Sequence, residues 1–134
     1  MNKIRILFVD NDEGYVKSIK DAYESLGNNI RITHSDPGDS LLELKTRNYD
    51  MMIIDIGEAS FGERPFGLVD RVRDLRPNMP VVSRGGMGLA VNEAGKYFDE
   101  HIYERHCYVG DEIIKILEEY GFEVEGERQI YNDS

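Results

Sequence analysis

The sequence predicts an α/β domain with a five-stranded parallel sheet and helices on both faces. Short apolar runs alternate with stretches whose apolar residues recur at helical spacing, which is the pattern of successive βα units. Two apolar runs end abruptly in an acid, at Asp10 and at Asp55. Because the carboxyl ends of parallel strands meet at one edge of a sheet, where α/β proteins bind ligands, we expect these acids to form one site.

Five segments are predicted to be strands. Residues 51–54 (MMII) are continuously apolar and belong at the centre of the sheet, since a strand buried on both faces has no solvent-facing positions. Residues 30–33 (IRIT) alternate between apolar and polar, as expected at an edge. The other predicted strands are residues 4–9, 81–83 and 101–104.

Helices are predicted between the strands and after the last one. The first follows the acids at residues 10–13 and ends at Gly27, and the second begins at Asp36-Pro37, because proline suits the first helical turn. Further helices are expected at residues 68–75, 89–99 and 111–120. Residues 1–121 are predicted to form one domain, followed by a polar tail over residues 122–134.

Composition restricts the function classes. The formal net charge of −10 argues against direct binding of nucleic acid, which requires a basic surface. Cys107 is the single cysteine and excludes an internal disulfide framework. No apolar run is long enough to span a membrane, and the first residues lack the features of a signal peptide. We therefore expect a cytoplasmic protein without membrane contact.

Four segments together resemble a known family. They are residues 6–10 (ILFVD), 49–55 (YDMMIID), 67–73 (GLVDRVR) and 77–82 (PNMPVV). In this order and spacing they are similar to the receiver domains of bacterial two-component response regulators, over roughly residues 3–120. The resemblance implies a flavodoxin-like (βα)5 fold, a doubly wound parallel sheet, with residues 1–121 as the receiver-like domain.

The resemblance also implies a site. Asp55 matches the phosphoacceptor, whose carboxylate attacks the phosphorus of a phosphohistidine to form an acyl phosphate. Asp10 matches the first of two acids that bind Mg²⁺, and the backbone carbonyl of Gly57 matches a further metal ligand. Where the second acid is usual, this chain has Asn11, followed by Asp12. Asn11 can still offer a carbonyl oxygen to Mg²⁺, and Asp55 is also an expected metal ligand. Asp12 either restores part of the lost negative charge or caps the first helix.

Other positions depart from the family pattern. Ser83 is the candidate for the hydroxyl that the family places at the end of the fourth strand, although strand-end hydrogen bonding explains it equally well. The usual Lys-Pro pair is absent after Pro80, and Arg105 or His106 is the candidate for the lysine position. The loop after Asp55 is lengthened and contains Arg64. The segment at residues 84–88 (RGGMG) is predicted to be irregular.

Three functions fit these observations. The first is a stand-alone receiver that accepts a phosphoryl group from a sensor histidine kinase or phosphotransfer protein, uses Mg²⁺ and signals to a downstream protein partner, alone or as a homodimer. The second is a degenerate receiver that works as a phosphorylation-independent interaction module. The third is a haloacid-dehalogenase-like phosphatase with Asp10 as nucleophile and Asp12 as general acid, which leaves Asp55 without a role.

Overall fold

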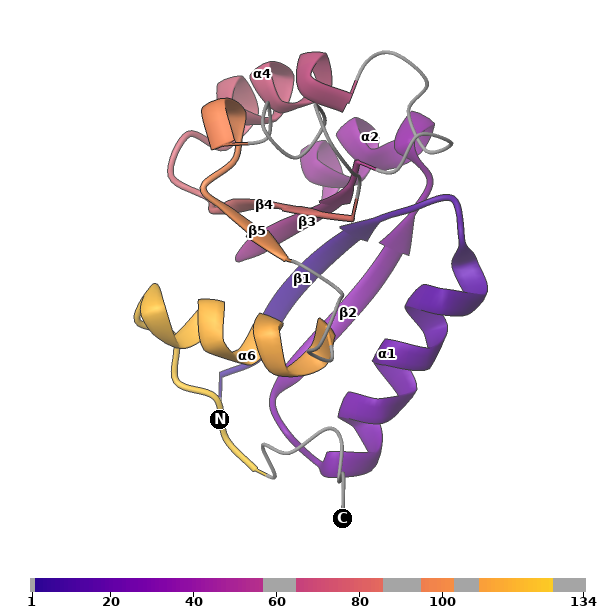
Figure 1. Cartoon of the computed structure of the whole chain (residues 1–134), viewed down its shortest axis with the longest axis vertical. Coiled ribbons are helices and arrows are strands. Elements are labelled where there is room, and N and C mark those ends of the chain that lie inside the picture. Colours follow the sequence, from indigo (N-terminus) through magenta and orange to yellow (C-terminus); the bar gives the residue numbers. More distant parts are fainter. Residues whose placement is uncertain (1, 57–64, 86–94, 103–108, 127–134) are drawn as a thin grey trace.

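The computed structural model describes residues 2–56, 65–85, 95–102 and 109–126 (Figure 1). The strands are β1 (Ile4–Val9), β2 (Ile30–Ser35), β3 (Met51–Asp55), β4 (Val81–Arg84) and β5 (Glu100–Ile102). The helices are α1 (Glu13–Leu26), α2 (Ser40–Thr46), α4 (Pro65–Leu75) and α6 (Val109–Glu119), and a short 3-10 helix (Pro37–Asp39) precedes α2.

All five strands are parallel and follow the order β2-β1-β3-β4-β5. Helices α1 and α6 cover one face of the sheet, and α2 and α4 cover the other (Figure 1). The strand order is that of flavodoxin-like proteins. The predicted doubly wound fold is therefore confirmed, with β3 in the centre and β2 at an edge.

Four strands differ at their ends from the sequence-based expectation. β2 continues to Ser35 instead of residue 33, and β3 continues to Asp55 instead of residue 54. β4 continues one residue beyond Ser83, because Arg84 pairs with Asp55 and its carbonyl accepts a hydrogen bond from the backbone N–H of Ile56 at 2.9 Å. β5 begins at Glu100 instead of residue 101 and is described as far as Ile102. Of the helix predicted at residues 89–99, only residues 95–99 are described, and residues 95–97 are helical.

The core consists of one apolar cluster on each face of the sheet, and β3 contributes to both. Met51 and Ile53 pack under α1 and α6, whereas Met52 and Ile54 pack against the helices of the other face. All four side chains are fully buried. Since successive side chains of a strand point to opposite faces, this arrangement explains why the segment is apolar at every position.

Helix α1 is amphipathic and has defined ends. Val16, Ile19 and Tyr23 form its buried face. Its N-cap is Asp12, whose side chain accepts a hydrogen bond from a backbone N–H of the first turn. Gly27 ends the helix in the left-handed conformation. None of the described helices has the length and apolarity needed to cross a bilayer.

The described part of the predicted polar tail packs against the domain. Val124 is buried in the same cluster as α6, and Phe122 lies partly buried beside it. The side chain of Asn29 donates to the carbonyl of Glu123 at 3.0 Å and accepts from the N–H of Glu125 at 2.8 Å. Contacts of the domain therefore continue beyond residue 121, at least as far as residue 125.

Candidate functional site

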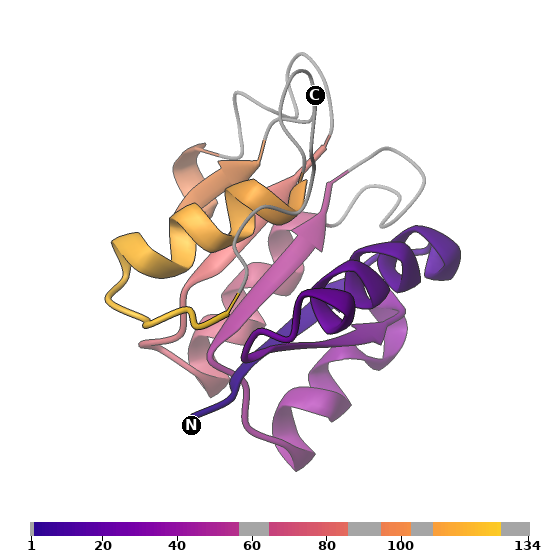
Figure 2. The same cartoon turned by 90° about the horizontal axis from the view of Figure 1, so that it is seen from below.

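The carboxyl ends of the central strands lie at one edge of the sheet (Figure 2) and bring together Asp10, Asp55 and Arg84. Asp10 follows β1, and the other two residues end β3 and β4 and pair with each other across the sheet. The residues two positions before each of them belong to the core under α1 and α6. Because strand side chains alternate, all three residues face α1. The structure thus brings the two acids together around one guanidinium.

Asp10 is almost completely enclosed, with 3% of its side chain exposed. Its Oδ1 accepts a hydrogen bond from the backbone N–H of Asp12 at 2.8 Å, and its Oδ2 accepts one from Nη1 of Arg84 at 2.9 Å. Its backbone carbonyl lies 2.7 Å from Nε2 of His34. Both carboxylate oxygens thus have a nitrogen donor before any ligand arrives.

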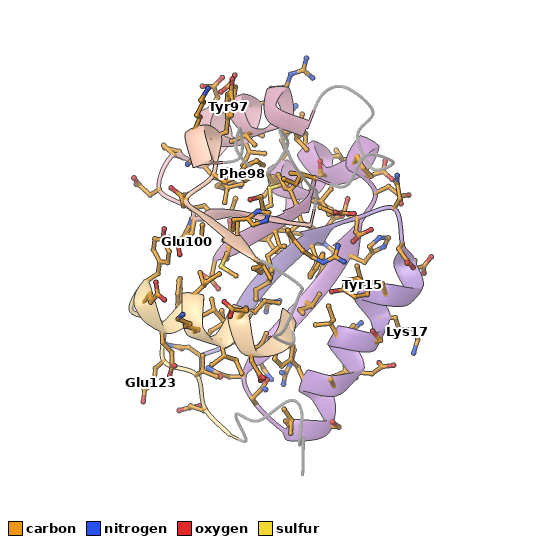
Figure 3. The ribbon with its side chains drawn as sticks, in the orientation of Figure 1. Tyr15, Lys17, Tyr97, Phe98, Glu100 and Glu123 are labelled. Atoms are coloured by element: carbon orange, nitrogen blue, oxygen red, sulfur yellow. The ribbon has the colours of Figure 1, made fainter. Side chains whose placement is uncertain are left out.

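Arg84 is the centre of this arrangement. Besides its bond to Asp10, Nη1 lies 3.5 Å from Oδ1 of Asp55. Nε donates to the hydroxyl of Tyr15 at 3.1 Å, and the guanidinium carbon lies 4.0 Å from the centroid of the same ring. Figure 3 shows Tyr15 on the side of α1 that faces the sheet, where its ring also packs edge-on against Phe8. The guanidinium therefore contacts two acids and one aromatic residue from three different elements.

The pKa of Asp10 is raised above its ordinary value. The main cause is burial, because a carboxylate loses hydration when it leaves water. The N–H of Asp12 opposes this shift, the charge of Asp55 adds to it, and the guanidinium of Arg84 opposes it. The arginine is therefore one of the two contacts that favour the charged form of this acid.

Asp55 is also partly enclosed, with 14% of its side chain exposed. Gly85, the residue after β4, lies directly beside it. A Cβ atom at Gly85 would come within 2.9 Å of Oδ1 of Asp55, and the φ of +77° is one that side-chain-bearing residues rarely adopt. Gly85 therefore allows the β4 backbone to approach this carboxylate.

The other predicted metal ligands have different positions. Oδ1 of Asp12 accepts from the N–H of Tyr15 at 3.0 Å, so the alternative of a helix cap is the one that the structure supports. Asn11 is exposed on the same turn. Gly57 lies outside the described residues, as does Arg64.

Ser83 has a partner of its own. Its hydroxyl is fully buried and lies 2.6 Å from Nδ1 of His101, its neighbour on β5. Ser83 pairs with Ile54, whereas Arg84 pairs with Asp55. Because strand side chains alternate, the Ser83 hydroxyl belongs to the opposite face from Asp55. The observed contact matches the strand-end hydrogen bond that was the alternative to a switch role.

Arg84 supplies the cation of the site, and the sequence pattern alone does not single it out. Arg105 and His106, the candidates for the lysine position, lie outside the described residues. The sequence pattern places Arg84 in an irregular segment because two glycines follow it. The available signal was its place two residues after the apolar residues Val81 and Val82, since a residue there reaches the same edge as Asp55.

The described acids do not fit the expected Mg²⁺ site. Mg²⁺ requires nearly octahedral oxygen ligands at about 2.1 Å, whereas both carboxylate oxygens of Asp10 accept nitrogen donors and Arg84 contacts both Asp10 and Asp55. A metal ion bound to these acids would lie close to the guanidinium of Arg84 and would be repelled by it. Even two like unit charges about 4 Å apart repel by about 4 kcal/mol at an effective dielectric constant of about 20. Across the described ranges, no group of three or more His, Cys, Asp or Glu side chains is arranged to hold a metal ion.

Solved structures share this fold. A CheY-like receiver domain from Methylobacillus flagellatus superposes with a TM-score of 0.71 and 22% identity, covering 88% of this chain and 98% of that one. A CheY-like receiver domain protein from Methanospirillum hungatei gives 0.69 and 21%, covering 88% and 94%. An adenylate cyclase from Rhodopirellula baltica gives 0.68 and 19%, covering 87% and 85%. No protein-family model and no curated protein matches the sequence. The fold is therefore that of response-regulator receiver domains.

Proposed function

We propose that this chain, which has the fold of response-regulator receiver domains, is a signalling module that accepts a phosphoryl group on Asp55. The observation that carries the proposal is the position of Asp55. It ends the central strand and keeps 14% of its side chain exposed. It also lies 3.5 Å from a guanidinium nitrogen of Arg84. The acid is thus accessible to a donor and has a cation beside it.

The proposed reaction needs few protein groups. An oxygen of the Asp55 carboxylate attacks the phosphorus of a phosphohistidine, so that an O–P bond forms and the P–N bond breaks. The imidazole nitrogen keeps the electron pair and takes up a proton. Arg84 can hydrogen-bond to oxygens of the transferred group, because guanidinium groups suit phosphate. Phosphoryl transfer depends mainly on such positioning and charge stabilisation.

The proposed donor is a sensor histidine kinase or phosphotransfer protein, and the output is a changed contact with a protein partner. Phosphorylation of Asp55 adds negative charge next to Arg84, which can then move between Asp10 and the new group. The sequence offers one aromatic-rich region as a candidate for partner contact, with Met87, Tyr97, Phe98, Tyr103 and Tyr108. Within it, Phe98 is buried in the core and Tyr97 packs partly against it. Met87, Tyr103 and Tyr108 lie outside the described residues.

The test is incubation with a small phosphoramidate, followed by measurement of the intact mass. Samples with Mg²⁺ and with a chelator show whether the reaction uses the metal. We expect a phosphoryl adduct in the wild type and in Asp70→Asn, a control that removes an exposed acid from α4. Asp55→Asn should form none. An adduct that persists in Asp55→Asn would refute the assignment of the acceptor.

A phosphorylation-independent interaction module is the second candidate. The contact between Arg84 and Asp10 favours it, because the acids of the site already have a permanent cation. This candidate predicts no adduct with any donor and partner binding that Asp55→Asn leaves unchanged. The phosphatase alternative gains no support, since the Asp12 side chain caps α1.

A further inference from the structure

A buried arginine occupies the centre of the acidic site. We infer that the guanidinium of Arg84 takes the place of a divalent cation, so that the two carboxylates have a counter-charge and the site folds without metal. This role of Arg84 toward Asp10 and Asp55 does not depend on whether Asp55 accepts a phosphoryl group.

The position of the guanidinium is built into the fold. Arg84 belongs to β4, and its backbone register with Asp55 is set by the sheet. Its side chain is only 11% exposed. Tyr15 contacts the guanidinium with its hydroxyl and with the face of its ring. The carboxylate of Asp10 accepts a hydrogen bond from the guanidinium at 2.9 Å. These contacts with Tyr15 and Asp10 hold the guanidinium beside the two acids.

The charges of the site favour Arg84 alone over Arg84 together with a divalent metal ion. The carboxylates of Asp10 and Asp55 together with the guanidinium of Arg84 leave one net negative charge. A divalent cation added to them would reverse the sign and lie close to the guanidinium. Without the arginine, the same cation would neutralise the two carboxylates. Arg84 and a divalent cation therefore compete for the same acids.

The experiment measures metal binding directly and uses no phosphodonor. Mn²⁺, which suits the same oxygen ligands as Mg²⁺, is titrated into the full chain, and binding is followed by electron paramagnetic resonance. The urea midpoint is compared in Mg²⁺ and in chelator at equal ionic strength. The variants are Arg84→Met, which removes the charge, and Arg84→Lys, which retains it. Arg71→Met serves as control, because Arg71 is an exposed arginine on α4.

We expect wild type, Arg84→Lys and Arg71→Met to bind Mn²⁺ weakly, with urea midpoints that do not depend on Mg²⁺. Arg84→Met should bind Mn²⁺ on the order of a hundredfold more tightly, because one like charge is removed from beside the ion. Its midpoint should rise with Mg²⁺. Asp10→Asn introduced into Arg84→Met should abolish both effects.

Two results would overturn the inference. One is tight Mn²⁺ binding by the wild type that Asp10→Asn removes, because the arginine would then coexist with the metal. The other is an Arg84→Met variant that binds Mn²⁺ no better than the wild type. If Arg84→Met does not fold in chelator, rescue of folding by Mg²⁺ supports the inference, and Arg84→Gln replaces it in the titration.

Discussion

Removal of the Arg84 charge should destabilise the domain strongly. Coulomb's law at an effective dielectric constant of about 20 gives roughly 6 kcal/mol for unit charges 2.9 Å apart and roughly 5 kcal/mol for 3.5 Å. Desolvation of the three groups offsets much of this attraction. In buried pairs, loss of one partner still costs about 3–5 kcal/mol, because the other charge is left uncompensated. We expect a loss in this range for Arg84→Met.

Asp10→Asn should cost less than Arg84→Met. The arginine keeps Asp55 at 3.5 Å and its contacts with Tyr15, whereas loss of the arginine leaves two carboxylates close together. The double variant Asp10→Asn with Arg84→Met should be more stable than the sum of the two losses predicts. The difference is the coupling free energy of the pair.

The assay is urea unfolding followed by circular dichroism, in chelator at neutral pH and again at acidic pH. Burial and the neighbouring Asp55 raise the pKa of Asp10, so this acid takes up a proton at a higher pH than an exposed aspartate. Protonation removes the uncompensated charge of Arg84→Met. Its deficit relative to the wild type should therefore shrink as the pH falls. A loss below about 1 kcal/mol at neutral pH, as for an exposed ion pair, would refute the buried counter-ion.

Three further predictions concern residues around this site and in the core. Gly85→Ala should destabilise the domain by about 1–3 kcal/mol, because of its positive φ and its 2.9 Å approach to Asp55, and urea unfolding should show it. Asp12→Ala should cost about 1 kcal/mol through loss of the α1 cap without changing Mn²⁺ binding, whereas a metal ligand would change both. Burial raises the pKa of Tyr23 well above its ordinary value. Above about pH 10 the unfolded chain therefore loses the phenolic proton more readily than the folded chain, and the free energy of unfolding falls. Tyr23→Phe should reduce this fall when urea unfolding is measured at increasing alkaline pH.

The fold could be predicted because its signals are local. Each apolar run and each helical repeat lies within about twenty residues, and short connections between such elements favour a parallel sheet. That β3 lies inside the sheet also follows from its own residues, since only a strand covered on both faces buries four consecutive apolar side chains. The end of β4 was harder to predict, because Arg84 is charged and a glycine follows it. In the sheet its pairing with Asp55 outweighs that local signal.

The roles of Asp12 and Ser83 show a similar division. From sequence, each had a chemical and a structural interpretation that the residue type alone could not separate. The structure gives Asp12 to the N-terminus of α1 and Ser83 to His101 on the neighbouring strand. The partner of Asp12 depends on where α1 begins, and the partner of Ser83 depends on which strand lies beside β4. Strand pairing is not encoded in any short segment.

The sequence by itself determined that Asp10 and Asp55 lie at the carboxyl ends of strands, at one edge of an α/β sheet, because apolar runs of strand length lead directly into both acids. Only the tertiary structure decided which cation accompanies them. Arg84 is 74 residues from Asp10 in the chain, and their contact requires β3 to lie between β1 and β4 and α1 to bring Tyr15 over the guanidinium. Strand order, register and helix packing act together there, and none of them is a property of a local segment.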